Sequence, residues 1–341
     1  MTVTGDVRPG LRRERLTGLM SRCVTQMRID LAGAVVVTEA ATGPYAVTPV
    51  LAAMAGAEFV VGVTRDTRYG TADQVRQETY ELARAAGVLD RLLVTTQSPH
   101  SVVPQGDVIT NSGHLRPLDR TLVGLMKPDA VVPLMFESWE IQAGRVDLDL
   151  DAMRERGIRA AGTNERHPLV GVFCHLGTMA VKLLLDAGTG VRGDRVLLLC
   201  DNPFAAYIEG GLTSCGAEVR TQDTLRVTDL GDWQPDVVLV ALTPTGKPVF
   251  DTVTTSLLRS TWPAAFVAQF WGDIDREALD RQGVAYWPPE SPGAGHMAVL
   301  PSDVGPEPVV RLQAGGLKVA SVLRTPHERR TAFDLGFLDE L

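Results

Sequence analysis

The segment 191–223 limits the possible folds more than any other part of the sequence. It reads VRGDRVLLLCDNPFAAYIEGGLTSCGAEVRTQD. It begins with a short continuous apolar run, RVLLLC, which is typical of a strand buried on both faces of a parallel sheet. A turn, the helical segment AAYIEGGLTSCGA and a second strand, EVRTQ, follow. This order predicts a β-α-β unit, and therefore a parallel sheet covered by helices.

The turn of this unit departs from the pattern of dinucleotide-binding proteins. Those proteins place G-x-G-x-x-G between strand and helix, so that bare backbone can approach a pyrophosphate. Here the turn reads CDNPF, residues 200–204, and no glycine appears before Gly210. Pro203 lacks an amide hydrogen and Asp201 would repel a phosphate. The scaffold indicates a Rossmann fold, whereas the loop lacks the usual ligand-binding residues.

Four residues are nevertheless candidates for cofactor binding because they follow strands of this half. Asp223, which ends the second strand, can hold a ribose diol. Trp271 can stack on a planar ring or, equally, fill the space left by an absent phosphate. The set comprises Asp201, Asn202, Asp223 and Trp271. NAD(P) is thus the cofactor to test, although the turn argues against it, and no spacing of His and Cys predicts a metal site.

Strand and helix patterns alternate along the whole chain. In the first half, strands are expected at 34–39, 58–64, 92–96, 107–111, 130–136 and 158–164. In the second half they are expected at 195–200, 218–222, 236–243, 264–272 and 284–288. The apolar stretch 170–188 predicts a long helix between the halves. We therefore predict an α/β protein with two Rossmann/flavodoxin-like domains, whose parallel sheets are flanked by helices and joined by a long bridging helix.

A chain of 341 residues favours two domains. We expect an N-terminal extension (1–30), a flavodoxin-like domain (31–169), the bridging helix (170–190), a degenerate Rossmann domain (191–306) and a C-terminal helix that returns to the first domain (307–341). The extension should contain an amphipathic helix. The Pro/Gly-rich stretch 288–308 should form a long loop, which in a compact domain is usually functional.

Charge and composition argue against several classes of partner. The formal net charge is −8 and the basic run near the N-terminus does not extend beyond RRER, so neither nucleic acid nor an anionic membrane is expected. No apolar segment suggests a secretory signal or a membrane span. The four cysteines lie far apart, which favours reduced thiols. We expect a cytoplasmic protein with a small-molecule substrate.

Ionisable residues follow the first-half strands in unusual density. In open α/β sheets, ligands bind beyond the carboxyl ends of the strands. The candidate catalytic residues are Glu39, His114, Glu137 and, in the long loop, His296. The candidate substrate-binding residues are Arg65, Asp66, Asn111, Trp139, Asn164, Glu165, Arg166 and His167.

Each of these candidates also has a purely structural interpretation. Glu39 can cap the turn that follows its strand, and Arg65 can form a surface ion pair with Asp66. Residues 164–167 can lock the two domains by salt bridges as well as orient a ligand. Loops between strands and helices favour polar capping residues in any case.

The order of elements resembles the D-2-hydroxyacid dehydrogenase family, also called formate/glycerate dehydrogenase-like. The resemblance rests on VDLDLDAMRERGIRAAGTNERHP (146–168) followed by the apolar helix, on DVVLVALTPT and on FVAQFWGDIDREAL. It covers most of residues 90–325 as a pattern and implies the fold, an NAD-type cofactor and a homodimer. Trp271 occupies the position of the family's catalytic arginine, and Glu290 and His296 match its acidic residue and its late histidine.

Two functions are compatible with these features. The first is a divergent NAD(P)-dependent oxidoreductase that acts on a small polar metabolite in the cleft between the domains. The second is a non-redox biosynthetic enzyme, of lyase, hydrolase or condensing type, on a dehydrogenase-like scaffold that no longer binds a dinucleotide. The architecture favours the first, and the missing glycines favour the second.

Overall fold

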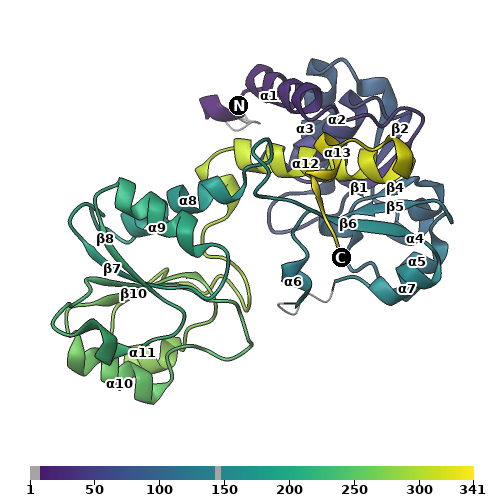
Figure 1. The fold of residues 1–341 in the computed structure, drawn as a ribbon. Helices are drawn as coiled ribbons and strands as arrows, with labels where there is room; N and C mark the ends of the chain where they lie inside the picture. The colour runs from purple at the N-terminus through teal and green to yellow at the C-terminus, as the bar shows by residue number, and fades with distance from the viewer. Residues whose placement is uncertain (1–7, 143–146) are drawn as a thin grey trace. The chain divides into compact units, whose positions relative to one another are not determined.

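The computed structural model describes residues 8–142 and 147–341, which form two compact units (Figure 1). Unit 1 contains the described residues up to Val172 together with Gly305–Leu341, and unit 2 is Phe173–Val304. Residues 1–7 of the expected N-terminal extension and Val146 of the motif at 146–168 lie outside the described residues.

Unit 1 is built on a seven-stranded sheet with the order β12-β6-β5-β4-β1-β2-β3. All neighbouring strands pair in parallel except β12, which runs antiparallel to β6. The strands are β1 (Val35–Glu39), β2 (Phe59–Val63), β3 (Leu92–Thr95), β4 (Val108–Ile109), β5 (Val131–Pro133), β6 (Arg159–Thr163) and β12 (Leu338–Asp339). The first six were predicted; β12 was not, because two residues carry no alternation.

Helices cover both faces of this sheet. Side chains that alternate along β1 divide between the two cores: Val36 joins a core built by α1 (Arg13–Gln26), α2 (Val47–Met54), α3 (Ala72–Ala85) and α12 (Glu307–Arg324). Val37 joins the opposite core, built by α4 (Pro99–Val102), α5 (Arg120–Leu125) and α7 (Leu150–Glu155). The remaining helical segments are η1 (Pro9–Leu11), η2 (Gly43–Ala46), η3 (Leu89–Arg91), η4 (Val103–Gln105), η5 (Gly113–Leu115), α6 (Trp139–Gln142), η9 (His327–Arg329) and α13 (Ala332–Leu335).

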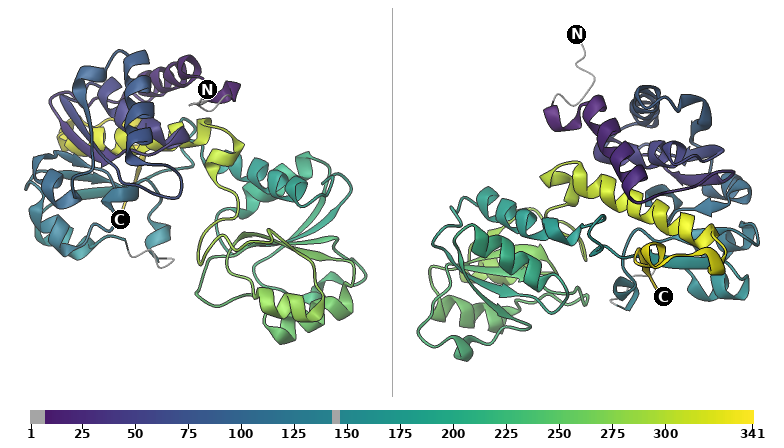
Figure 2. Two further views of the ribbon diagram at one scale, coloured as in Figure 1. Left: turned by 180° about the vertical axis from the view of Figure 1, so that it is seen from behind. Right: turned by 45° about the horizontal axis from the view of Figure 1, so that its top comes forward.

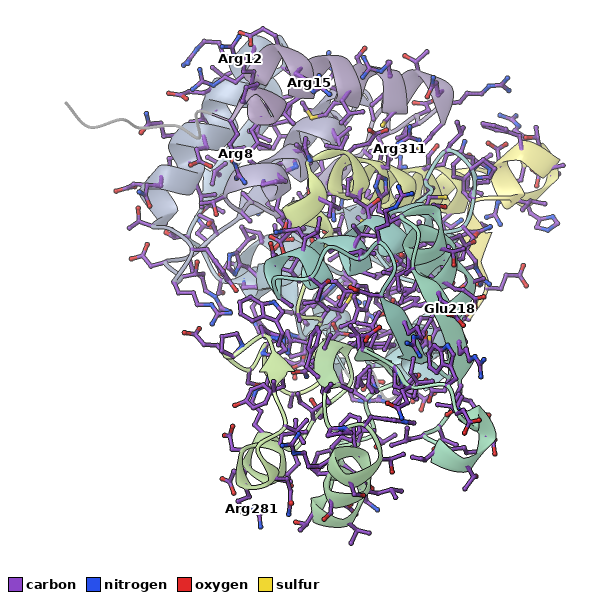
Figure 3. The ribbon with its side chains drawn as sticks, turned by 90° about the vertical axis from the view of Figure 1, so that its left-hand side faces the viewer. Arg8, Arg12, Arg15, Glu218, Arg281 and Arg311 are labelled. Carbon is purple, nitrogen blue, oxygen red and sulfur yellow. The ribbon has the colours of Figure 1, made fainter. Side chains whose placement is uncertain are left out.

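The amphipathic N-terminal helix is confirmed as α1. Leu16, Leu19 and Met20 are buried, whereas Arg12 and Arg15 are exposed. Figure 3 labels Arg12, which precedes the helix, and Arg15, which lies near its start. Helix α12 runs beside α1 (Figure 2) and is buried along most of its length.

Unit 2 is built on a five-stranded parallel sheet with the order β11-β10-β9-β7-β8. Its strands are β7 (Arg195–Leu199), β8 (Glu218–Gln222), β9 (Val237–Ala241), β10 (Phe266–Trp271) and β11 (Tyr286–Trp287). Its helices are η6 (Phe173–His175), α8 (Leu176–Asp186), α9 (Ala205–Ser214), η7 (Val227–Leu230), α10 (Thr252–Thr261), α11 (Arg276–Gln282) and η8 (Pro301–Val304). The predicted α/β class with two parallel sheets flanked by helices is therefore confirmed.

The helix predicted over 170–188 is shorter than expected. Gly171 has a left-handed φ of 57°, which a continuous helix does not tolerate, and α8 begins only at Leu176. Within unit 2, Gly177 of α8 faces Gly211 of α9, and a Cβ at either glycine would overlap the backbone of the other helix. The apolar character of this segment thus reflects close packing of two helices.

None of the helices in the described part of the chain is long and apolar enough to cross a membrane.

Candidate active site

The carboxyl edge of the unit 1 sheet brings together predicted residues from β1 and β4. The parallel register pairs Val36 with Val108 and Val37 with Ile109, so that, continued by two residues, it sets Glu39 level with Asn111. Paired side chains in a parallel register share a face, and successive side chains alternate between faces. Glu39 and Asn111 therefore project to the same face of the sheet.

The opposite face of this edge carries three buried hydroxyl groups. Thr110 Oγ1 donates to Thr38 Oγ1 at 2.8 Å and lies 2.6 Å from Ser112 Oγ. These hydroxyls satisfy one another and fix the ends of β1 and β4. The sequence did not reveal them as a group, because single Thr and Ser residues at strand ends are common.

Glu39 is a buried acid beneath the loop that follows β4. It is 9% exposed, and it accepts a hydrogen bond from the backbone amide of His114. Burial raises the pKa of Glu39, and the Arg116 charge and the His114 amide oppose that shift only partly. A protonated carboxyl in such a place can donate a proton or a hydrogen bond.

The space for Glu39 depends on Gly113. This glycine adopts φ of 35°, and a Cβ placed on it would overlap Oε2 of Glu39. A side chain at position 113 would thus displace either the loop or the carboxyl group. Gly113 belongs to the site for this steric reason, not as a ligand-binding residue.

Asn111 is held by Arg116, a residue that was not predicted from the sequence. Arg116 Nε donates to Asn111 Oδ1 at 2.9 Å, and Nη2 donates to the Asn111 carbonyl oxygen at 2.9 Å. Arg116 Nε also lies 3.0 Å from Asp147 Oδ2. The Asn111 side chain is fully buried, and its Nδ2 has no hydrogen-bond partner among the described residues. A buried amide donor without a partner costs stability, so it marks a place where a ligand atom can bind.

His114 lies in η5 and is partly buried. Burial lowers its pKa, and the charge of Arg65 lowers it further. A neutral imidazole can accept a proton near neutral pH. Arg65 is exposed after β2, so its charge is available to an anionic ligand at this end of the sheet.

Asp66 is used within the protein. Its Oδ1 accepts a hydrogen bond from the backbone amide of Ala72 at 2.7 Å, which ties the loop to the start of α3. This contact gives Asp66 a structural role, and its predicted role in substrate binding remains a prediction.

A second group of predicted residues meets around Glu137, which follows β5 and is only 1% exposed. Its Oε1 accepts from the Glu165 amide at 3.0 Å and from Arg166 Nε at 3.1 Å. Its Oε2 lies 2.9 Å from Arg166 Nη2 and accepts from Trp139 Nε1 at 3.1 Å. Four donors thus occupy this carboxylate, which fits a positioning role for Glu137 better than the predicted catalytic one.

Asn164 and His167 contact the C-terminal segment of unit 1. Asn164 Nδ2 donates to the Gly336 carbonyl at 2.9 Å. The His167 ring stacks on Phe337 at 3.8 Å between centroids, and its Nδ1 accepts from the Leu169 amide at 3.2 Å. Burial lowers the pKa of His167. These contacts hold β12 against β6.

An open depression of about 510 Å³ also lies in unit 1, lined by Pro117, Asp119, residues 148–151 and Arg154. It contains none of the predicted site residues. Two of its carboxylates, Asp119 and Asp149, cap α5 and α7 by accepting from the Leu122 and Ala152 amides. The other two charged residues of the depression, Asp151 and Arg154, pair with each other at 2.9 Å.

In unit 2, the turn between β7 and α9 is closed by its own side chains. Asn202 Oδ1 accepts from the Phe204 amide at 3.1 Å, and Asn202 Nδ2 donates to the Ala241 carbonyl at 2.7 Å. Asp201 Oδ1 accepts from the amide and the hydroxyl of Thr243, at 2.8 and 2.9 Å. These bonds tie the turn to the end of β9.

The remaining residues predicted to bind a cofactor also contact the protein itself. The Trp271 ring lies 5.2 Å from that of Phe204, the residue that precedes α9. Asp223 pairs with Arg226 at 2.6 Å, and this hydrogen bond lowers the pKa of Asp223. A pyrophosphate needs free amides and bare backbone at this turn. The residues present do not fit a dinucleotide bound there in the usual way.

His296 is exposed in the loop after β11, and its Nδ1 lies 3.0 Å from the Ala294 carbonyl. Glu290 is exposed as well. Both belong to unit 2, so neither joins the group around Glu39 within one unit. No three His, Cys, Asp or Glu side chains in residues 8–142 and 147–341 are grouped so that they could hold a metal ion.

Comparison with known proteins gives the fold. No protein-family model matches the sequence, and no curated protein matches it. Among solved structures, a dipicolinate synthase chain from Bacillus halodurans is similar, with a TM-score of 0.52 at 12% identity over 87% of this chain and 100% of that chain. The pyruvate reductase of Chlamydomonas reinhardtii is similar with a TM-score of 0.51 at 12% identity, over 85% and 96% of the two chains.

The chain shares the α/β fold of these two solved structures. The fold that the resemblance implied is thus confirmed. Identities this low carry no substrate, cofactor or reaction to this chain.

Proposed function

We propose that the protein is an enzyme that acts on a small polar metabolite by acid–base chemistry at Glu39 and His114. Its dehydrogenase-like scaffold would hold no dinucleotide at the β7–α9 turn. The observation that carries this proposal is the burial of Glu39 beneath the His114 amide, with its pKa raised. Buried ionisable groups with displaced pKa values concentrate at functional sites, because catalysis needs them and stability does not.

The roles follow from the directions of the two pKa shifts. A raised pKa favours the neutral form of Glu39, which can donate a proton, and a lowered pKa favours the neutral form of His114, which can accept one. Arg65, whose charge acts on His114, attracts an anionic group of the substrate. Glu137 and Arg166 hold the neighbouring loops in place.

A second candidate is an NAD(P)-dependent oxidoreductase, which the architecture favours. The dinucleotide would then have to bind without the amides that Asn202 and Pro203 remove from the turn, and beside the carboxylate of Asp201.

Titration with NAD(H) and NADP(H), followed by fluorescence and by thermal unfolding, separates the two candidates. Our proposal predicts no change in Tm up to millimolar cofactor. A saturable rise would favour the oxidoreductase, since a ligand at 100 times its Kd stabilises the folded state by about 2.7 kcal/mol.

Catalysis can be tested without knowledge of the substrate. The purified protein is incubated with a mixture of small polar metabolites, and consumption is followed by NMR. Glu39→Gln and His114→Ala should abolish any consumption while retaining the fold. Glu58→Gln and His100→Ala change exposed residues of the same types and should leave it unchanged. Turnover that survives in both site variants would refute the acid–base roles.

We also propose that the protein forms a homodimer, as the family resemblance implies. Light scattering on the purified protein tests this directly.

A further inference from the structure

Arg116 makes contacts that an ordinary surface arginine does not make. Its guanidinium reaches both oxygens of Asn111, through Nε to Oδ1 and through Nη2 to the carbonyl oxygen. Its charge also reaches Glu39. The Arg116 side chain is 31% exposed and pairs with Asp147, which anchors the guanidinium from the other side.

These contacts determine which way the Asn111 amide faces. A guanidinium only donates hydrogen bonds, so the Asn111 atom that it meets must be the acceptor Oδ1. The second amide atom, Nδ2, is therefore a donor. It is buried, and no acceptor among the described residues meets it. An orphaned buried donor destabilises the folded protein unless something else supplies the acceptor.

We propose that Arg116 is a positioning residue that presents Asn111 Nδ2 as a hydrogen-bond donor to an oxygen acceptor of the substrate. The acceptor is a carbonyl or a carboxylate oxygen. This inference rests on the proposed function, because it gives the same site its means of recognising the substrate. Asn111 contacts the substrate, whereas Arg116 acts only through Asn111.

Two substitutions separate the charge of Arg116 from its geometry. Arg116→Lys keeps the positive charge and loses the planar fork that holds Asn111. Arg116→Met loses both. Arg120→Met is the matched control: Arg120 lies nearby in the chain, is 59% exposed and pairs with Glu155 and Asp149.

Side-chain NMR reads the donor directly. The Asn111 Nδ2 resonance is assigned by its disappearance in Asn111→Asp, and acetate and acetone serve as carboxylate and neutral carbonyl probes. We expect a saturable shift of this resonance with at least one probe, and the probe that acts identifies the acceptor. In Arg116→Lys and Arg116→Met the apparent affinity should fall about tenfold or more, which corresponds to at least 1.4 kcal/mol, while Arg120→Met should match the wild type.

Titration of Glu39 provides a second test, because the pKa of Glu39 would not change if Arg116 had a purely structural role. Arg116→Met should raise the pKa of Glu39, since the Arg116 charge lowers it, whereas Arg116→Lys should leave it nearly unchanged. Thus Arg116→Lys should lose probe binding yet keep the Glu39 titration.

Two results would overturn the inference: no shift of the Asn111 resonance with either probe, or undiminished shifts in both Arg116 variants. If an Arg116 variant does not fold, Asn111→Asp carries the test, because it keeps an acceptor for Arg116. Its loss of probe-induced shifts at the Gly113 and His114 amides supports the inference, and retention contradicts it. If Glu39→Gln and His114→Ala stay active while Asn111 responds, the proposed function fails and this inference stands.

Discussion

The carboxyl edges of the two parallel sheets use polar side chains in opposite ways. In unit 1, Glu39 is buried with its pKa raised, and Asn111 keeps a donor for which the described residues supply no acceptor. In unit 2, Asp201 and Asn202 direct their hydrogen bonds to Thr243, Ala241 and Phe204. The unit 1 edge therefore contains a buried donor without an acceptor among the described residues, whereas these polar groups of the unit 2 edge bond to the protein itself.

The position of glycine accounts for much of this difference. At the unit 1 edge, Gly113 leaves room for a carboxyl group against the backbone. The β7–α9 turn of unit 2 has no glycine, and its Pro203 has no amide hydrogen to offer a phosphate.

The largest effect is expected from Gly113→Ala. The added Cβ overlaps Glu39 and the backbone conformation is left-handed, so the free energy of unfolding should fall by about 2–5 kcal/mol. Denaturant unfolding measures this value. Gly124→Ala in α5 is the control: it meets no neighbouring atom and should stabilise the protein by up to about 1 kcal/mol. Equal effects of the two substitutions on the free energy of unfolding would show that Glu39 does not require glycine at position 113.

Asp201→Ala should have a smaller effect, confined to unit 2. It removes both bonds to Thr243 from an exposed carboxylate, and we expect a loss of about 1 kcal/mol. A double-mutant cycle with Thr243→Val isolates the hydroxyl bond. If Asp201→Ala also brings tight NAD(H) binding, the carboxylate alone keeps this edge closed, and the contrast between the two edges sharpens.

Glu39→Gln should change how stability depends on pH. The pKa of Glu39 is raised in the folded protein, so its contribution is fully present below the unfolded pKa and is lost as pH rises through the folded one. The free energy of unfolding of the wild type should equal that of Glu39→Gln near pH 4. Towards pH 8 it should become the lower of the two, by about 1.4 kcal/mol for each unit by which folding raises the pKa. If the free energy of unfolding changes with pH in the same way in both proteins, folding does not raise the pKa of Glu39.

His114→Gln should have the smallest effect on how the free energy of unfolding depends on pH, and the effect should have the opposite sign to that of Glu39→Gln. The pKa of His114 is lowered by burial, so its contribution is present above the unfolded value, about 6.5, and declines as the solution is acidified. Between pH 7.5 and 5 the wild type should lose slightly more stability than His114→Gln. Unfolding curves collected across this range test the slope, and a reversed slope would indicate that a carboxylate stabilises the protonated imidazole.

Much of the fold was predictable from local patterns. Sequence patterns located eleven of the twelve strands in the described part of the chain. For strands such as β7 and β9 the signal was an apolar run, since a strand buried on both faces needs several consecutive apolar residues. The C-terminal helix expected within 307–341 is observed as α12 over Glu307–Arg324. The two-residue strand β12 has no such signal, because its pairing with β6 depends on contacts between distant segments.

For the candidate site, the sequence alone predicted Glu39, Asn111 and His114, because strand ends of a parallel sheet meet at one edge. It could not identify Arg116 or the need for glycine at position 113, since both depend on how the loop after β4 folds back over β1. Nor could it distinguish Glu137, whose oxygens meet four donors, from Glu39, whose pKa is raised by burial. Order along the chain determines which residues share an edge, but only packing in three dimensions determines which of them remain available, because hydrogen-bond saturation and desolvation depend on neighbours that lie far apart in sequence.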